Sequence, residues 1–142
     1  KARTPPESSV LRKGPGERVV ACCSDADDER CRTLSGVATV IRTGEGEVDL
    51  EALLSTLYKM GVRRLMVEGG GRLIGGLFAR GLVDEFITFI GNIVIGGETS
   101  PTPADGPGFT REEAFTRLTL FSVERMDHGV LLRWLVDRNT PE

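Results

Sequence analysis

The chain has 142 residues, 39% hydrophobic and 27% charged, which is ordinary for one globular domain. Its formal net charge of -3 provides no basic stripe, so nucleic acid is not expected as the main partner. No run approaches the ~18 apolar residues of a membrane span, and no membrane association is expected.

The first segments predict a strand followed by a helix. Residues 1–16 are rich in Pro, Gly and charge and are expected to form a loop or an edge, and residues 18–22 are expected to form a covered strand. Ser24 is then expected to cap a helix. Three acids that fit its first turn, rather than a metal site, are Asp25, Asp27 and Asp28.

The cysteines form an odd set without zinc spacing, namely Cys22, Cys23 and Cys31. They are expected to be buried free thiols in a reducing cytosol, which indicates a cytoplasmic protein without a metal site.

Residues 37–41 predict a second strand, and residues 43–46 predict a turn. Asp49 is expected to cap a helix whose apolar face is formed by Leu50, Leu53, Leu54 and Leu57. Gly61 is expected to end this helix in the left-handed conformation.

Residues 62–67 predict a strand that runs through Glu68 and the glycines of residues 69–71 into a helix. Glycines at such a corner let a phosphate approach free backbone N–H groups at the positive end of the helix. The alternative is a tight strand-to-helix turn without a ligand, because the pattern is neither a dinucleotide fingerprint nor a P-loop. Gly75 and Gly76, inside the helix, indicate a close neighbour, either another element or a ligand.

The last third predicts strands and a hairpin. Residues 86–90 are apolar, and the apolar run resumes at residues 93–95 before a loop over residues 98–109. Thr110 and Glu113 have the spacing of a capping box. The final two strands, residues 118–123 and 130–136, are expected to pair through a turn that contains His128, which is expected to be a turn residue rather than a catalyst.

The fold class expected from this order is α/β. Strands that alternate with helices predict a mostly parallel sheet, to which the C-terminal hairpin adds an antiparallel edge. Ligands of such sheets bind beyond the carboxyl ends of the strands, where residues 68–71 are expected to lie.

An ordered series of motifs resembles the reductase domain of riboflavin biosynthesis, and the resemblance covers most of the chain. The matching segments are Val67–Leu73, Gly81–Glu85, Ile93–Gly97 and Gly106–Phe109, and residues 48–67 are similar as well. The resemblance implies a dihydrofolate-reductase-like fold and the use of NADPH. The implied reaction transfers a hydride to C1′ of a ring-opened ribosylamino-pyrimidine 5′-phosphate, with a proton to nitrogen or sugar oxygen, and yields the ribitylamino compound.

By this resemblance, Glu68 contacts the substrate and the cofactor phosphates lie along Gly70, Gly71, Arg72, Leu73, Ile74, Gly75 and Gly76. A carboxylate is unfavourable beside a diphosphate, so Glu68 is expected to point toward the sugar hydroxyls. No residue is assigned as catalytic. The exposed sheet edges and the apolar residues 86–95 also predict a homodimer.

The chain departs from the family pattern in three respects. The N-terminal third, which holds the first strand and much of the substrate phosphate site, is expected to be missing, so residues 1–142 are read as one truncated domain. Arg72 replaces a small hydroxyl residue and is expected either to reach a cofactor phosphate or to lie in solvent. Asn92 replaces a frequent Pro.

The zinc signature of the deaminase domain that often accompanies this reductase does not occur in the sequence.

Two other hypotheses stay open. The chain could be a non-catalytic nucleotide-binding module, which NADPH binding without turnover would indicate. It could also be a reductase of another heterocycle, such as a pterin, on the same fold, which a substrate screen would separate from the first hypothesis.

Overall fold

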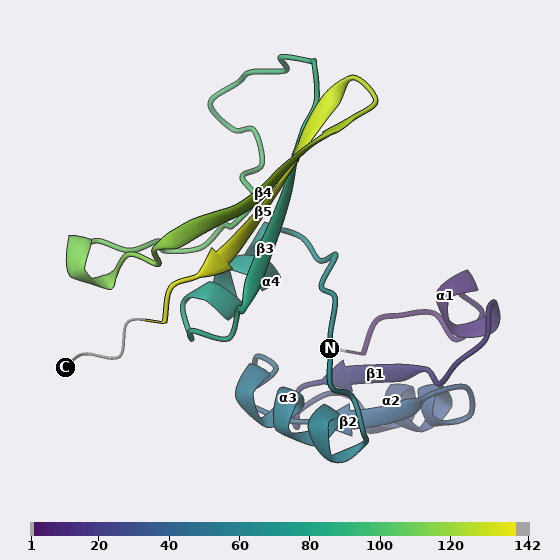
Figure 1. Cartoon of the computed structure of the whole chain (residues 1–142). Coiled ribbons are helices and arrows are strands. Elements are labelled where there is room, and N and C mark those ends of the chain that lie inside the picture. Colours follow the sequence, from purple (N-terminus) through teal and green to yellow (C-terminus); the bar gives the residue numbers. More distant parts are fainter. Residues whose placement is uncertain (1, 139–142) are drawn as a thin grey trace. The chain divides into compact units, whose positions relative to one another are not determined.

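The computed structural model describes residues 2–138, and the chain divides into two compact units, Lys1–Leu65 and Met66–Glu142 (Figure 1). Each unit is described by itself below. The single domain expected over residues 1–142 therefore stays a prediction. No described helix has both the length and the apolar character needed to cross a membrane.

The first unit has a β-α-β arrangement in which two strands pair in parallel. Cys22 at the end of β1 lies beside Arg42 at the end of β2. The helix α2 connects these strands, as expected of a parallel crossover. The elements in chain order are α1 (Ser9–Arg12), β1 (Val19–Cys22), α2 (Asp28–Ser35), β2 (Thr39–Arg42) and α3 (Leu50–Lys59).

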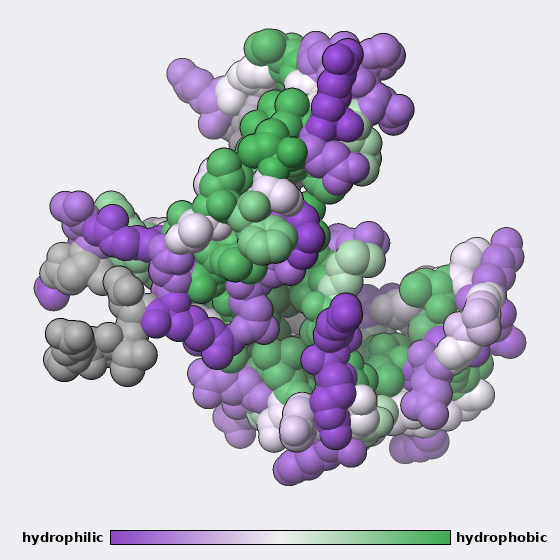
Figure 2. Space-filling view, viewed as in Figure 1, coloured by the Kyte–Doolittle hydropathy of each residue, from purple (hydrophilic) through white to green (hydrophobic). Residues whose placement is uncertain are grey.

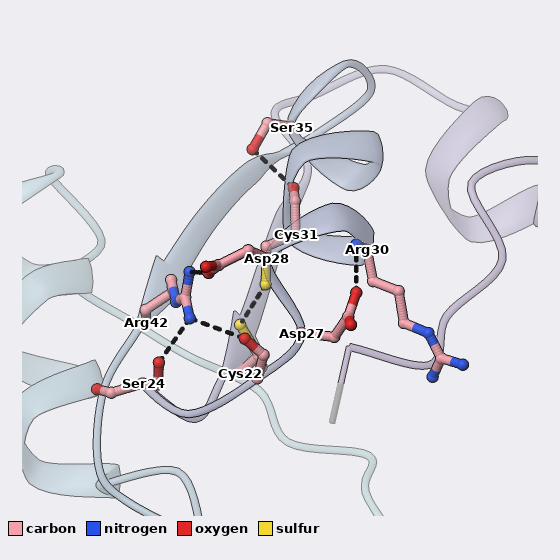
Figure 3. Close-up of polar contacts among 9 residues, drawn as sticks. Cys22, Ser24, Asp27, Asp28, Arg30, Cys31, Ser35 and Arg42 are labelled. Carbon is pink, nitrogen blue, oxygen red and sulfur yellow. Dashed lines mark hydrogen bonds and ion pairs between the residues drawn. The ribbon is translucent and has the colours of Figure 1, made fainter.

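The core of this unit confirms the prediction of buried free thiols. Cys22, Cys23 and Cys31 are all buried and free. The Sγ atoms of Cys22 and Cys31 lie 3.6 Å apart between β1 and α2 (Figure 3). Burial, followed by the contact with Cys31, raises the pKa of the Cys22 thiol, so this thiol stays neutral near pH 7.

The start of α2 lies three residues later than predicted. Asp27, not Ser24, is the N-cap, and its Oδ1 accepts a hydrogen bond of 2.8 Å from the Arg30 N–H (Figure 3). The backbone of Ser24 is used elsewhere, since its N–H donates to the Gly44 carbonyl and its carbonyl accepts from Arg42.

Arg42 connects the end of β2 to this loop and to α2. Its guanidinium donates to Asp28 Oδ1 over 2.5 Å and to the Ala26 carbonyl over 2.8 Å (Figure 3). This hydrogen bond and the positive charge of Arg42 lower the pKa of Asp28 below its ordinary value. The predicted acids at residues 25–28 therefore serve local structure, and Asp25 accepts a hydrogen bond from the Gly46 N–H.

The next helix, α3, was correctly predicted. Asp49 is its N-cap and accepts a hydrogen bond of 3.0 Å from the Ala52 N–H. The helix closes at Met60, and Gly61 follows with φ +96°, the left-handed conformation expected after a helix end.

The predicted strand over residues 62–67 is not formed. Val62 donates back to Leu57 in the turn after α3, and residues 63–67 have no strand partner within residues 2–138. Leu65 and Met66 are correspondingly exposed. A strand needs a neighbour to receive its backbone hydrogen bonds, and the apolar pattern alone does not supply one.

The second unit contains a three-stranded antiparallel sheet with the order β3-β5-β4. Its elements are α4 (Gly71–Phe78), β3 (Glu85–Ile90), a 3₁₀ turn η1 (Glu112–Ala114), β4 (Leu118–Met126) and β5 (Gly129–Val136). The predicted hairpin is confirmed, with Asp127 at its tip in the left-handed region at φ +49°. The strand β4 is longer than predicted and has an irregularity between Leu120 and Ser122.

Other details of this unit differ from the predictions. Residues 93–95 form no strand, and their side chains are exposed. The N-cap of η1 is Arg111 and makes no side-chain hydrogen bond, while the side chain of Glu113 lies outside the described part of the structure. The α/β class with a parallel pair and a C-terminal antiparallel hairpin is confirmed, but the strands form two sheets instead of one mixed sheet.

The helix α4 packs on one face of the three-stranded sheet. The ring of Phe78 meets that of Phe86 edge-on, with centroids 5.2 Å apart. On the opposite face, Arg133 forms an ion pair of 2.7 Å with Glu85. Ile87 and Phe89 are about half exposed, and apolar surface is visible over this sheet in Figure 2.

The Asp28–Arg42 pair predicts how the stability of the protein depends on pH. At pH 7, Asp28→Asn should be less stable than the wild type in urea unfolding followed by circular dichroism. Because the folded-state pKa of Asp28 is depressed, its contribution is complete above about 3.8, the ordinary pKa, and is lost as the pH falls below it. The difference between the two proteins should therefore shrink below that pH.

Glu29→Gln is the matched control, since its carboxylate lies in the same helical turn without a bond in the described structure. An equal loss of stability in both variants, or a difference that is independent of pH, would contradict the assignment.

Candidate glycine-rich site

The candidate site is the glycine-rich turn that leads into α4. Gly70 is the N-cap of this helix, and its carbonyl accepts hydrogen bonds from the N–H groups of Leu73 and Ile74. The N–H groups of Gly70, Gly71 and Arg72 donate to no acceptor within residues 2–138. A helix leaves these first N–H groups unpaired, and an anion can accept hydrogen bonds from them.

The glycines of this turn are needed for different reasons. A Cβ on Gly69 would come within 2.6 Å of the Leu73 side chain. A Cβ on Gly71 would overlap the Asp105 carboxylate, and a Cβ on Gly75 would overlap the Asp105 carbonyl. Backbone contacts therefore exclude larger residues at Gly71 and Gly75, whereas at Gly69 the Leu73 side chain would have to shift.

Gly70 differs from the others. A Cβ placed on it meets nothing within 4 Å, and its φ of -65° and ψ of 166° suit any residue. Gly70 is also exposed. Neither packing nor backbone strain requires a glycine here. Glycine is a favourable N-cap residue, and its lack of a Cβ also leaves the backbone open to close approach by a ligand.

The charges around the turn favour an anion. The helix has no acid of its own in the first turn, where Arg72 instead adds a positive charge to the positive end of the helix dipole. Arg72 is exposed and forms no ion pair within the described residues. Glu68 is also exposed, and its carboxylate makes no hydrogen bond to any residue that the structure describes.

The other residues predicted along α4 have different environments. Leu73 is 41% exposed, whereas Ile74 and Gly76 are half-buried. Gly75 lies against the backbone of Asp105. Gly70, Gly71 and Arg72 thus lie at the start of the helix. One helical turn later, Gly75 faces the loop that contains Asp105.

The loop over residues 98–109 was predicted, but its contact with α4 was not. The Asp105 N–H donates to the Gly71 carbonyl over 2.9 Å, which joins segments that are more than thirty residues apart. Gly75 and Gly76 indicated a close neighbour of the helix, but their pattern does not identify which segment of the chain that neighbour is.

The first unit has a separate cavity of about 750 Å³. It lies between residues 2–6 and α2, and its charged lining includes Arg3, Arg30 and Glu29. None of the predicted site residues lines it. It is therefore not part of the glycine-rich turn.

The described residues contain no group of three or more His, Cys, Asp or Glu side chains arranged to hold a metal ion. His128 is exposed in the hairpin turn.

Comparison with known proteins identifies relatives over most of the chain. Residues 1–132 match the family model described as the RibD C-terminal domain. A 2,5-diamino-6-ribosylamino-4(3H)-pyrimidinone 5′-phosphate reductase of Archaeoglobus fulgidus is 40% identical over 91% of this chain and 56% of its own length. The protein of the same name from Methanothermobacter thermautotrophicus is 38% identical over 95% of this chain and 62% of its own length.

Solved structures agree in fold. RibD of Acinetobacter baumannii has a TM-score of 0.74 to this chain at 20% identity, over 96% of this chain and 36% of that one. The chain spans only 56–62% of the length of the two reductases named above. With a family model matched over residues 1–132, the chain belongs to the RibD C-terminal domain family.

Proposed function

We propose that the protein is an NADPH-dependent reductase of riboflavin biosynthesis. It converts the ribosylamino side chain of a pyrimidine 5′-phosphate into a ribitylamino side chain. Membership of the family supports this proposal, as do the names of three relatives that are 33–40% identical to the chain.

The observation that carries the cofactor assignment is the environment of Gly70. Its N–H and those of Gly71 and Arg72 have no acceptor among the described residues, and no side chain fills the space where a Cβ would lie. A diphosphate bridge supplies the acceptor oxygens that these N–H groups lack. The residues present therefore fit the phosphate part of a dinucleotide.

Each residue of the turn has a distinct task in this proposal. When bound, NADPH supplies the hydride. The backbone of Gly70 and Gly71 holds its diphosphate, and Arg72 adds positive charge beside it. Glu68 accepts hydrogen bonds from hydroxyl groups of the substrate sugar, so that the carbon to be reduced is held in a fixed orientation.

The assembly and location of the protein belong to the same proposal. Half-exposed apolar side chains on the three-stranded sheet, such as Ile87 and Phe89, support a homodimer. The three free thiols support a reducing, cytoplasmic environment.

The direct test is oxidation of NADPH by the full-length protein with ribosylamino-pyrimidine 5′-phosphate, followed at 340 nm. Conversion of this substrate to the ribitylamino product supports the proposal. Turnover of a dihydropterin in its place would assign a different substrate, and NADPH binding without any turnover would indicate a non-catalytic module.

Substitution of Gly70 should separate cofactor binding from stability. Gly70→Val should weaken NADPH binding at least tenfold in a fluorescence titration, because the added side chain keeps phosphate away from the free N–H groups. The free energy of unfolding should change by less than about 1 kcal/mol, because the backbone is unstrained and the space is open.

Gly91→Ala is the control for this variant, since a Cβ there makes only an ordinary contact of 3.7 Å with Phe89. Undiminished NADPH affinity in Gly70→Val would contradict the assignment of the cofactor diphosphate to this turn.

Substitution of Glu68 should affect the other ligand. Glu68→Gln should raise the KM for the pyrimidine substrate about five- to tenfold, as expected when a charged acceptor of hydroxyl hydrogen bonds becomes neutral. The dissociation constant of NADPH should stay within twofold of the wild type. Steady-state kinetics with each ligand varied separately measures both effects.

The control is Glu98→Gln, which neutralises an exposed carboxylate on a loop of the same unit. If Glu68→Gln changed only the affinity for NADPH, Glu68 would be assigned to the cofactor site instead of the substrate site.

A further inference from the structure

A loop far along the chain holds the start of α4. The Asp105 N–H donates to the Gly71 carbonyl over 2.9 Å. The Asp105 carbonyl lies so close to Gly75 that a Cβ there would overlap it. Gly71 and Gly75 are four residues apart and share one face of the helix, so Asp105 contacts two successive helical turns.

The side chain of Asp105 shapes this contact. Its Oδ1 accepts hydrogen bonds from the Thr102 hydroxyl over 2.5 Å and from the Thr102 N–H over 3.2 Å. These bonds close a turn over residues 102–105 and fix the backbone that meets α4. The other carboxylate oxygen, Oδ2, lies beside Gly71 at the start of the helix.

This arrangement supplies what the first turn of α4 lacks. The helix has no acid of its own there, and a negative group near its first turn stabilises the helix start. Asp105 is half-buried and comes from a separate segment of the chain. The orientation of the free N–H groups at Gly70 and Gly71 therefore depends on a contact with the loop as well as on the helix itself.

We propose that Asp105 is the positioning residue of the cofactor site, holding the first turn of α4 so that its free N–H groups face the diphosphate. This inference rests on the proposed function. Asp105 acts through Gly71 and Gly75 and touches no reacting atom. Its role is to fix the geometry on which binding at a helix start depends.

The test compares four variants of the full-length protein. Asp105→Ala removes the acceptor for Thr102, whereas Asp105→Asn keeps an acceptor oxygen and removes the charge. Thr102→Val removes the hydroxyl partner. Gly75→Ala pushes the loop away through the overlap of its Cβ with the Asp105 carbonyl. Glu98→Ala is the matched control on the loop after β3.

Positioning predicts a selective loss of cofactor affinity. In fluorescence titrations, the dissociation constant of NADPH should rise about tenfold in Asp105→Ala and in Gly75→Ala, the effect of one lost structural hydrogen bond or contact. Asp105→Asn should recover most of the affinity. The effect of Thr102→Val should not add to that of Asp105→Ala, because both remove the same bond.

Two further readouts separate positioning from a merely structural role. At saturating NADPH, kcat and the KM for the pyrimidine in Asp105→Ala should stay within twofold of the wild-type values. Hydrogen exchange without cofactor should be faster in Asp105→Ala at the amides of Leu73 and Ile74, which donate to Gly70.

Several results would overturn the inference. Unchanged NADPH affinity and unchanged exchange in Asp105→Ala would show that the loop does not hold the turn. Tighter NADPH binding in Asp105→Ala than in the wild type would show that the carboxylate repels the cofactor more than it positions the turn. A parallel loss of affinity, kcat and folding stability without recovery in Asp105→Asn would assign only a structural role.

Failure of the proposed function gives a different result. Wild-type protein that binds no NADPH would overturn the cofactor assignment itself. In that case the exchange measurement still decides whether Asp105 holds the start of α4.

Discussion

The central physical constraint in the second unit is the set of backbone donors at the start of α4. A helix leaves its first N–H groups without partners, and here neither a side chain nor another backbone segment accepts those of Gly70, Gly71 and Arg72 within the described residues. Arg72 adds a positive charge at the same end. The proposal of a phosphate ligand depends on these unpaired donors, although the Asp105 carboxylate also lies beside Gly71.

The glycines of this corner also show that one motif can combine unrelated requirements. Gly69 makes room for Leu73, and Gly71 and Gly75 make room for Asp105, so these three are explained by contacts within the chain. Gly70 has open space and an ordinary backbone conformation. Gly70 is thus the one glycine of this turn whose place in the helix cap leaves its backbone open to a ligand.

Sequence reasoning succeeded where the deciding interactions are local. The cap at Asp49, the left-handed Gly61 and the hairpin turn near Asp127 each depend on residues a few positions apart. The residue types at these positions carry the necessary information, because the partner is always the adjoining backbone. The burial of Cys22 and Cys23 was predicted from their place at the end of an apolar run.

Sequence reasoning failed where a distant partner decides the outcome. Ser24 is as good a cap as Asp27 by residue type, but contacts with Gly44 and Arg42 use its backbone instead. Residues 63–67 have the composition of a strand and no ladder to join within residues 2–138. The contact between Asp105 and α4 spans thirty residues and depends on how the loop folds back.

The charges around α4 bear on how tightly a cofactor should be held. The helix end and Arg72 attract a diphosphate, whereas the nearby carboxylate of Asp105 reduces that attraction while it orders the turn. A redox cofactor that supplies a hydride must leave in its oxidised form before the next turnover. Since both forms carry the same diphosphate, tighter phosphate binding would hold product as firmly as reactant and would not accelerate the chemical step. A well-ordered but only moderately attractive anion site therefore suits the proposed reaction better than a strongly cationic one, and a carboxylate that positions the backbone donors supplies that combination.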